Sequence, residues 1–233
     1  MTTQDIGGTI ARLLLAAGAV RVARERPFTL AAGWASPVYV DCRVLIGDPA
    51  ARRAVTACAV EAVGAAFAPG EIEIIAGAET AGIPYAAWLA DALDLPLAYV
   101  RKRPLGIGRN AQVEGAEVDK RRVLLVDDLT TDGASKVAFT RGLRMAGAEA
   151  RDALTVFYNA VFPGVAERLR AEGLRLLPLA TWDDILRVED GRGLSAADRA
   201  VLAEFRKDPI AWSTRHGGRS FAAERRATQK RAN

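Results

Sequence analysis

Histidine and cysteine are scarce in this chain of 233 residues. It contains one histidine, His216, near the C-terminus, and two cysteines, Cys42 and Cys58, without Cys-x-x-Cys spacing. The body of the chain therefore cannot hold a Ser-His-Asp or Cys-His catalytic group, which excludes most hydrolases. The two cysteines suggest neither a disulfide framework nor a zinc site, and they fit a reducing, cytoplasmic location.

Long apolar runs are missing as well. No apolar run reaches the roughly 20 residues that span a membrane, and no basic region precedes the first apolar stretch, so we expect no signal peptide. Half of all residues are nevertheless apolar. That content is enough for the core of one large α/β domain.

Positive charge is concentrated at the C-terminus. The formal net charge is +4, but residues 213–233 carry six Lys or Arg and one Glu, so the remaining body has a net charge of −1. We predict a single domain over residues 1–212 and a basic, flexible tail over residues 213–233. A body without excess positive charge has no basic binding face, and we expect neither nucleic acid nor membrane as a partner.

Strand-like and helix-like segments alternate along the chain, which predicts an α/β fold with a mostly parallel central sheet flanked by helices. The predicted strands are residues 72–76, 97–100, 123–126, 153–158 and 174–180. The predicted helices are residues 5–24, 48–67, 82–93, 136–145, 165–172, 182–188 and 195–205. We predict a hairpin around Gly33 within a small N-terminal hood, mainly residues 24–45. Residues 103–118 have no clear period and predict a mobile loop over the site.

The most informative stretch runs from Val123 to Ser135. Four apolar residues predict a buried strand, two aspartates follow it, and a turn rich in hydroxyl groups opens a helix. A helix start beyond the carboxyl end of a parallel strand presents free N–H groups, which suits a phosphate. Gly133 lets the backbone approach that ligand, the hydroxyls of Thr130, Thr131 and Ser135 add donors, and one of Asp127 and Asp128 can face a ligand hydroxyl pair or a metal.

A structural interpretation of the same stretch also exists. Asp132 or Thr131 would then cap the helix, and the aspartates would be a solvated strand end. The complete order of strand, paired acids, hydroxyl turn, glycine and helix favours a functional site. The string resembles the ribose-phosphate-binding signature of the type I phosphoribosyltransferases, in which two aspartates hold the ribose hydroxyls and the turn wraps the 5-phosphate.

Three further segments resemble one branch of that family, the orotate phosphoribosyltransferases. The hood pattern Phe28-Thr29-Leu30 with Gly33 and Ser36-Pro37 is similar to its N-terminal hood. Gly82-Ile83-Pro84 is similar to its pyrophosphate loop, and Tyr99-Val100-Arg101-Lys102 to the start of its mobile catalytic loop. With the central string, the four segments follow the family's order over roughly residues 5–190.

The resemblance implies transfer of a phosphoribosyl group from phosphoribosyl pyrophosphate (PRPP) to orotate, with Mg²⁺ as cofactor. It implies a homodimer with shared active sites. The catalytic residues implied are Asp127, Asp128, Arg101 and Lys102. Further PRPP contacts implied are Arg103, Thr80, Ala81, Leu129, Thr130, Thr131, Asp132, Gly133, Ala134 and Ser135. The orotate contacts implied are Thr131, Tyr39 and Val40. The Mg²⁺ would be bound mainly through ligand oxygens, with Asp127 and Asp128 as possible protein ligands.

Several charged residues usual in the family are absent. Ala31 and Ala81 stand where lysines are common, and Leu105 and Ile107 stand where a lysine and a histidine are common. The usual arginine for the orotate carboxylate has no match near Tyr158-Asn159. Candidate substitutes are Arg24, Arg43, Arg109, Asn110 and Gln112. The departures keep two alternatives open, namely a phosphoribosyltransferase for another nucleobase and a non-catalytic PRPP-sensing regulator.

Overall fold

The structure is a computed structural model, and it describes residues 5–23, 25–104, 112–188 and 193–219. A six-stranded sheet in the order β10-β9-β8-β5-β6-β7 forms its centre. Its strands are β5 (Ile74–Ala78), β6 (Leu97–Val100), β7 (Val113–Gly115), β8 (Arg122–Thr130), β9 (Glu149–Tyr158) and β10 (Arg175–Thr181). All neighbours are parallel except β7, which pairs antiparallel with β6. The predicted mostly parallel α/β fold is confirmed.

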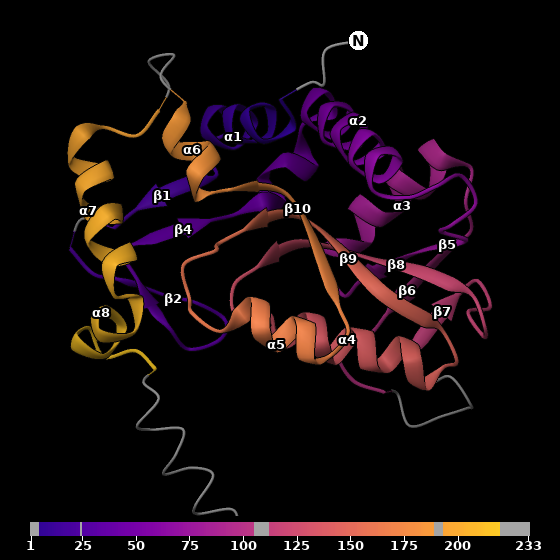
Figure 1. The fold of residues 1–233 in the computed structure, drawn as a ribbon. Helices are drawn as coiled ribbons and strands as arrows, with labels where there is room; N and C mark the ends of the chain where they lie inside the picture. The colour runs from indigo at the N-terminus through magenta and orange to yellow at the C-terminus, as the bar shows by residue number, and fades with distance from the viewer. Residues whose placement is uncertain (1–4, 24, 105–111, 189–192, 220–233) are drawn as a thin grey trace, which may run out of the picture.

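Helices cover both faces of this sheet (Figure 1). One layer contains α1 (Ile6–Ala16), α2 (Pro49–Ala66) and α3 (Gly82–Leu93), and the other contains α4 (Ala134–Met145) and α5 (Val165–Ala171). The remaining helices are η1 (Cys42–Gly47), α6 (Trp182–Arg187), α7 (Ala196–Lys207) and α8 (Pro209–Arg215). Because β8 lies between both layers, its apolar residues 123–126 are at most 1% exposed. None of the helices in the described ranges is long and apolar enough to cross a membrane.

The hood consists of two small antiparallel pairs. Strand β1 (Val20–Val22) pairs with β4 (Val38–Val40), and β2 (Phe28–Thr29) pairs with β3 (Ala35–Ser36). The predicted hairpin around Gly33 is confirmed, and this glycine has a φ of 85°. The prediction of one helix over residues 5–24 is wrong. Helix α1 ends at Ala16 because Gly18 adopts a φ of 63°, and the β-branched residues that follow pair with the hood.

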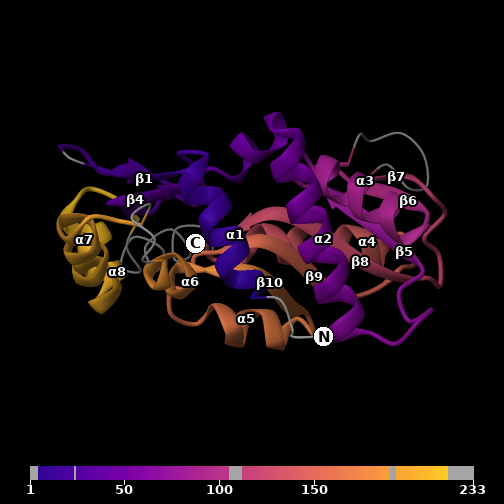
Figure 2. The same cartoon turned by 90° about the horizontal axis from the view of Figure 1, so that it is seen from above.

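The boundary predicted at residue 212 falls inside α8, which continues to Arg215. Helices α7 and α8 lie beside the hood in both views (Figures 1 and 2). Ser213 is fully buried, and the backbone N–H of Arg219 donates to Gly33 O at 2.8 Å. The prediction of a flexible tail is therefore wrong for residues 213–219, whereas residues 220–233 lie outside the described part of the chain.

Two other boundaries differ from the predictions. Strand β8 continues through the two aspartates to Thr130, because Thr130 still pairs with Tyr158 of β9. The segment predicted as a mobile loop contains β7, whose apolar Val113 is buried. Residues 105–111 of that segment lie outside the described residues, and so do the candidate substitutes Arg24, Arg109 and Asn110.

Candidate active site

A cavity of about 740 Å³ lies where the hood meets the carboxyl ends of β5, β6 and β8. The predicted site residues that line it are Tyr39, Val40, Thr80, Ala81, Lys102, Asp127, Asp128, Leu129, Thr131, Asp132, Ala134 and Ser135. Four other predicted residues, Arg101, Arg103, Thr130 and Gly133, do not line it. This is the edge at which open α/β sheets bind ligands.

Asp127 is held by a buried lysine. The Nζ of Lys136, on the first turn of α4, donates to Asp127 Oδ2 at 2.5 Å and to Leu129 O at 2.7 Å. Lys136 is fully buried, so its charge depends on these partners. The pair fixes the carboxylate against the scaffold and ties α4 to the end of β8.

Asp128, the neighbouring carboxylate, has no ion-pair partner among the described residues. Burial, together with the negative charge of Asp127, raises its pKa to about 7, against a smaller opposing effect of Lys136. A carboxylate with a raised pKa in a cavity is typical of a functional site. Asp128 is thus the member of the pair that is available for a ligand hydroxyl or a cation.

The turn between β8 and α4 requires a glycine at position 133. Gly133 has a φ of 76°, and a Cβ there would lie 3.1 Å from Leu169. The backbone N–H groups of Ala134 and Ser135 begin α4, where the helix dipole favours an anion. Asp132 Oδ1 accepts from Ala134 N at 3.1 Å, so the capping interpretation is correct for this carboxylate.

Side chains from the end of β9 and from helix α5 support the turn. Asn159 Nδ2 donates to Thr131 Oγ1 at 3.1 Å, and Asn159 Oδ1 accepts from Trp182 Nε1 at 3.0 Å. Arg168 Nη1 donates to Asp132 O at 2.9 Å. Asn159 stands near the position where the family places an arginine, and here its amide groups are used to hold the turn.

The loop after β5 forms another wall. It begins at Glu79 and leads into α3 at Gly82, and the Glu79–Thr80 peptide bond is cis. Gly82 is required by packing, because a Cβ there would lie 2.4 Å from Val126 O. Glu79 Oε2 accepts from the N–H of Lys102 at 2.7 Å, which links this loop to the end of β6.

The predicted cations occupy different places. Lys102 lines the cavity, whereas the guanidinium of Arg101 pairs with Glu114 of β7 and lies 3.9 Å from Glu79. Arg103 is exposed. The side chain of Gln112 donates to Arg101 O at 2.9 Å, so it supports the backbone of that strand.

Arg43 lines the hood side of the cavity. Its guanidinium donates to Asp41 at 2.6 Å and to Tyr39 OH at 3.1 Å, and the hydrogen bond lowers the pKa of Asp41. Trp34 is 4% exposed, and its ring lies 4.9 Å from that of Phe162. This burial assigns Trp34 to the packing of the hood against the core.

The lining is rich in carboxylates. Five of them line the cavity, together with two basic side chains, those of Arg43 and Lys102. No group of three or more His, Cys, Asp or Glu that could hold a metal occurs among the described residues. Mg²⁺ prefers one or two carboxylates together with substrate phosphates and waters. Asp128 fits such a site, in which the substrate supplies most of the oxygen ligands, whereas both oxygens of Asp127 are engaged by Lys136 and by the N–H of Asp128.

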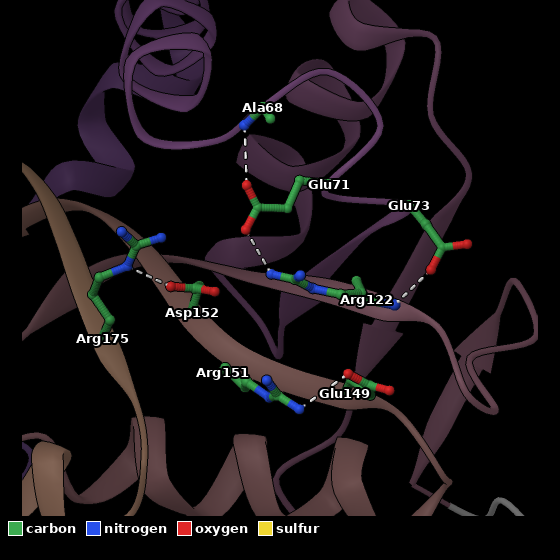
Figure 3. Close-up of polar contacts among 8 residues, drawn as sticks. All are labelled: Ala68, Glu71, Glu73, Arg122, Glu149, Arg151, Asp152 and Arg175. Carbon is green, nitrogen blue, oxygen red and sulfur yellow. Dashed lines mark hydrogen bonds and ion pairs between the residues drawn. The ribbon is translucent and has the colours of Figure 1, made fainter.

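A second cavity, of about 750 Å³, includes the first residues of β8 and β10 in its lining. Four arginines line it, and three of them, Arg122, Arg151 and Arg175, pair with acids (Figure 3). Arg122 pairs with Glu71 at 2.8 Å, and Arg175 pairs with Asp152 at 2.6 Å. The hydrogen bonds that Glu71 accepts from Ala68 N and Arg122 also lower its pKa. These ion pairs have a structural role, because they connect a loop to the first residues of the strands. We therefore take the first cavity as the candidate active site.

Some residues of the site were missed by sequence reasoning. Lys136, Glu79, Asn159 and Arg168 position the motifs, but no local pattern marks them. Lys136 follows Asp127 by nine residues, and only the return of α4 against β8 brings the two together. Phe139, one turn further along α4, also lines the cavity. The signal in the sequence that could have indicated it was its apolar position within the predicted helix of residues 136–145.

Comparisons with known proteins agree with this geometry. The phosphoribosyl transferase domain family matches residues 46–161. Orotate phosphoribosyltransferases of Cereibacter sphaeroides and Sinorhizobium medicae are 43% and 40% identical. These alignments cover 90% of both chains for the first, and 93% of this chain and 94% of the relative for the second. The crystal structure of orotate phosphoribosyltransferase from Aeropyrum pernix matches with a TM-score of 0.63 and 34% identity, over 76% of this chain and 96% of that one. The resemblance found in the sequence is confirmed, and the chain belongs to the orotate phosphoribosyltransferase family.

Proposed function

We propose that the chain catalyses the Mg²⁺-dependent transfer of the phosphoribosyl group from PRPP to orotate. The products are orotidine 5′-phosphate and pyrophosphate, as a step of pyrimidine synthesis. The observation that carries the proposal is the single cavity shared by the aspartate pair, the turn that opens α4, the loop after β5 and the hood. Each wall offers the chemistry that one part of these substrates needs.

The phosphate end of PRPP fits the turn that opens α4. The N–H of Ser135 supplies a backbone donor, and the hydroxyls of Thr131 and Ser135 add two more. Asp128 accepts hydrogen bonds from the ribose hydroxyls, and Asp127, fixed by Lys136, holds the end of β8 in place. This arrangement orients the anomeric carbon toward the hood.

Loss of pyrophosphate leaves positive charge on the ribose, as in glycoside cleavage. The carboxylate of Asp128 stabilises that charge, while Lys102 and the N–H groups of the loop at Thr80 and Ala81 stabilise the leaving group. Mg²⁺, when bound through substrate oxygens, neutralises further charge on the pyrophosphate. Exclusion of water from the occupied site would prevent water from competing with the base.

The base fits between Tyr39, Val40 and Thr131 at the hood side of the cavity. Arg43 lies on the same wall and is the described cation nearest to Tyr39, through its hydrogen bond to the phenol oxygen. We therefore assign orotate to the hood side, with the pyrophosphate toward Lys102 and the loop after β5.

We further propose a cytoplasmic homodimer with shared active sites. The buried free thiols of Cys42 and Cys58 support a reducing location. Two basic side chains are few for a substrate with this many phosphate charges, which supports a supply of further cations from a partner subunit. If Arg109→Ala lowers activity as Asp128→Asn does, mixing the two kinds of subunit should restore part of the activity where the sites are shared, and none where each site is built from one subunit.

One assay tests the function directly. Pure protein is mixed with PRPP, Mg²⁺ and orotate, and the loss of orotate absorbance is followed. Turnover with orotate supports the proposal. Turnover only with uracil or a purine would instead support a different nucleobase, and binding of PRPP without any turnover would support a sensor.

A further inference from the structure

Arg219, which follows α8, lies between the hood and the turn that opens α4. Its Nη1 donates to Ala32 O at 3.2 Å and to Asp132 Oδ2 at 3.3 Å. Its Cζ lies 5.2 Å from the centre of the Trp34 ring, a cation–π contact. One side chain thus joins two walls of the candidate active site, since Ala32 and Asp132 both line the cavity.

The backbone around Arg219 is held firmly in this place. The N–H of Arg219 donates to Gly33 O at 2.8 Å, and its carbonyl accepts from Ser213 Oγ at 3.0 Å. The same hydroxyl accepts from Ala35 N at 3.0 Å. A Cβ at Gly218 would lie 2.2 Å from Ala35 N, so the segment approaches the hood as closely as a glycine permits.

Asp132 poses an electrostatic problem for a phosphate site. Its side chain is 10% exposed, and Oδ1 already accepts from Ala134 N, an N–H at the start of α4. A carboxylate within the turn repels a phosphate dianion, the more so where water is excluded. On the side of Oδ2 lie the indole N–H of Trp34, at 3.4 Å, and the guanidinium of Arg219.

We propose that Arg219 is a positioning residue for the phosphate-binding turn. It offsets the charge of Asp132, and it holds the hood against the turn. The affinity of the turn for a phosphate therefore depends on a residue from the C-terminal segment. This inference rests on the proposed function only in that the turn binds the 5-phosphate of PRPP.

Arg219→Ala tests the inference. We expect the KM for PRPP and the dissociation constant of ribose 5-phosphate to rise about tenfold, which corresponds to about 1.4 kcal/mol, with kcat changed less than threefold. Arg219→Lys keeps the charge and should retain most of the affinity. Arg215→Ala removes an exposed arginine of α8 and is the matched control, with both constants unchanged.

A double-mutant cycle with Asp132→Asn separates charge compensation from a purely structural role. When Asp132→Asn is already present, adding Arg219→Ala should weaken ribose 5-phosphate binding by less than twofold, because no charge remains to be offset. Additive effects in the two backgrounds would overturn the inference, as would a loss of kcat and melting temperature without any change in ribose 5-phosphate binding. Failure of the wild-type protein to bind ribose 5-phosphate would instead refute the proposed function.

Discussion

Asp128→Asn should make the protein more stable and less active. The folded protein raises the pKa of Asp128 from 3.8 to about 7, mainly through burial. At about 1.4 kcal/mol per pH unit, ionising this group at high pH costs the folded state up to about 4 kcal/mol. Part of the Asp128 side chain remains exposed to solvent, which screens its charge. We therefore halve this figure to about 2 kcal/mol.

The sign and the pH window follow from the raised pKa. Below about pH 4 the carboxyl group is protonated in both states and costs nothing, and the cost grows until pH passes about 7. The asparagine variant lacks this cost. Without Mg²⁺ or PRPP, it should melt about 4–8 °C above the wild type at pH 8, and the gain should shrink to about a third at pH 5.

Activity should change in the opposite direction. Asparagine cannot carry the negative charge that faces the ribose, so kcat/KM for PRPP at pH 8 should fall by a factor of about 100 or more. In the wild type, kcat/KM for PRPP should decline below pH 7 as Asp128 takes up a proton in the free enzyme. The residual activity of the variant should lack this acid limb.

The neighbouring Asp127→Asn is the matched control. It removes the partner of the buried Lys136, so it should destabilise the protein by about 3–5 kcal/mol. Calorimetry of the wild type, Asp128→Asn and Asp127→Asn at pH 8 and pH 5 tests these stability predictions. The argument from burial would be refuted if Asp128→Asn melted at or below the temperature of the wild type at pH 8. It would also be refuted if the melting temperature rose equally at both pH values.

Three further predictions concern packing, support and metal. Gly82→Ala should lower the free energy of unfolding by about 1–3 kcal/mol and raise the KM for PRPP, since its Cβ would meet Val126 O. In the same denaturation assay, the control Gly64→Ala, on the exposed side of α2, should raise the free energy of unfolding by about 0.5–1 kcal/mol. Asn159→Ala should destabilise by about 1–3 kcal/mol and raise the KM for PRPP, because it leaves the indole N–H of Trp182 unpaired, and unchanged values would contradict its supporting role. Chelation of Mg²⁺ should abolish turnover yet leave the melting temperature of the ligand-free protein within about 1 °C, as expected for a metal held mainly by substrate.

Local patterns in the sequence were sufficient to predict the parts of the site that lie on contiguous segments. The apolar run from Val123 to Val126 requires burial on both faces, which predicts a central parallel strand. The acids and the glycine that follow can therefore be placed at its carboxyl end, beside a helix start. The same reasoning predicted the hood hairpin around Gly33, because the turn chemistry is local.

Only the tertiary structure determined which groups from distant segments meet. Lys136 holds Asp127 because α4 packs back on β8, and Asn159 holds Thr131 because β9 lies parallel to β8. The helix predicted over residues 5–24 ends at Ala16, because residues 20–22 pair with β4 as strand β1. Residues 213–219, which by composition suggested a flexible tail, instead bring Arg219 to Asp132. Burial and pairing depend on surroundings that no single segment contains, so the raised pKa of Asp128 and the placement of Arg219 could not be predicted from the sequence.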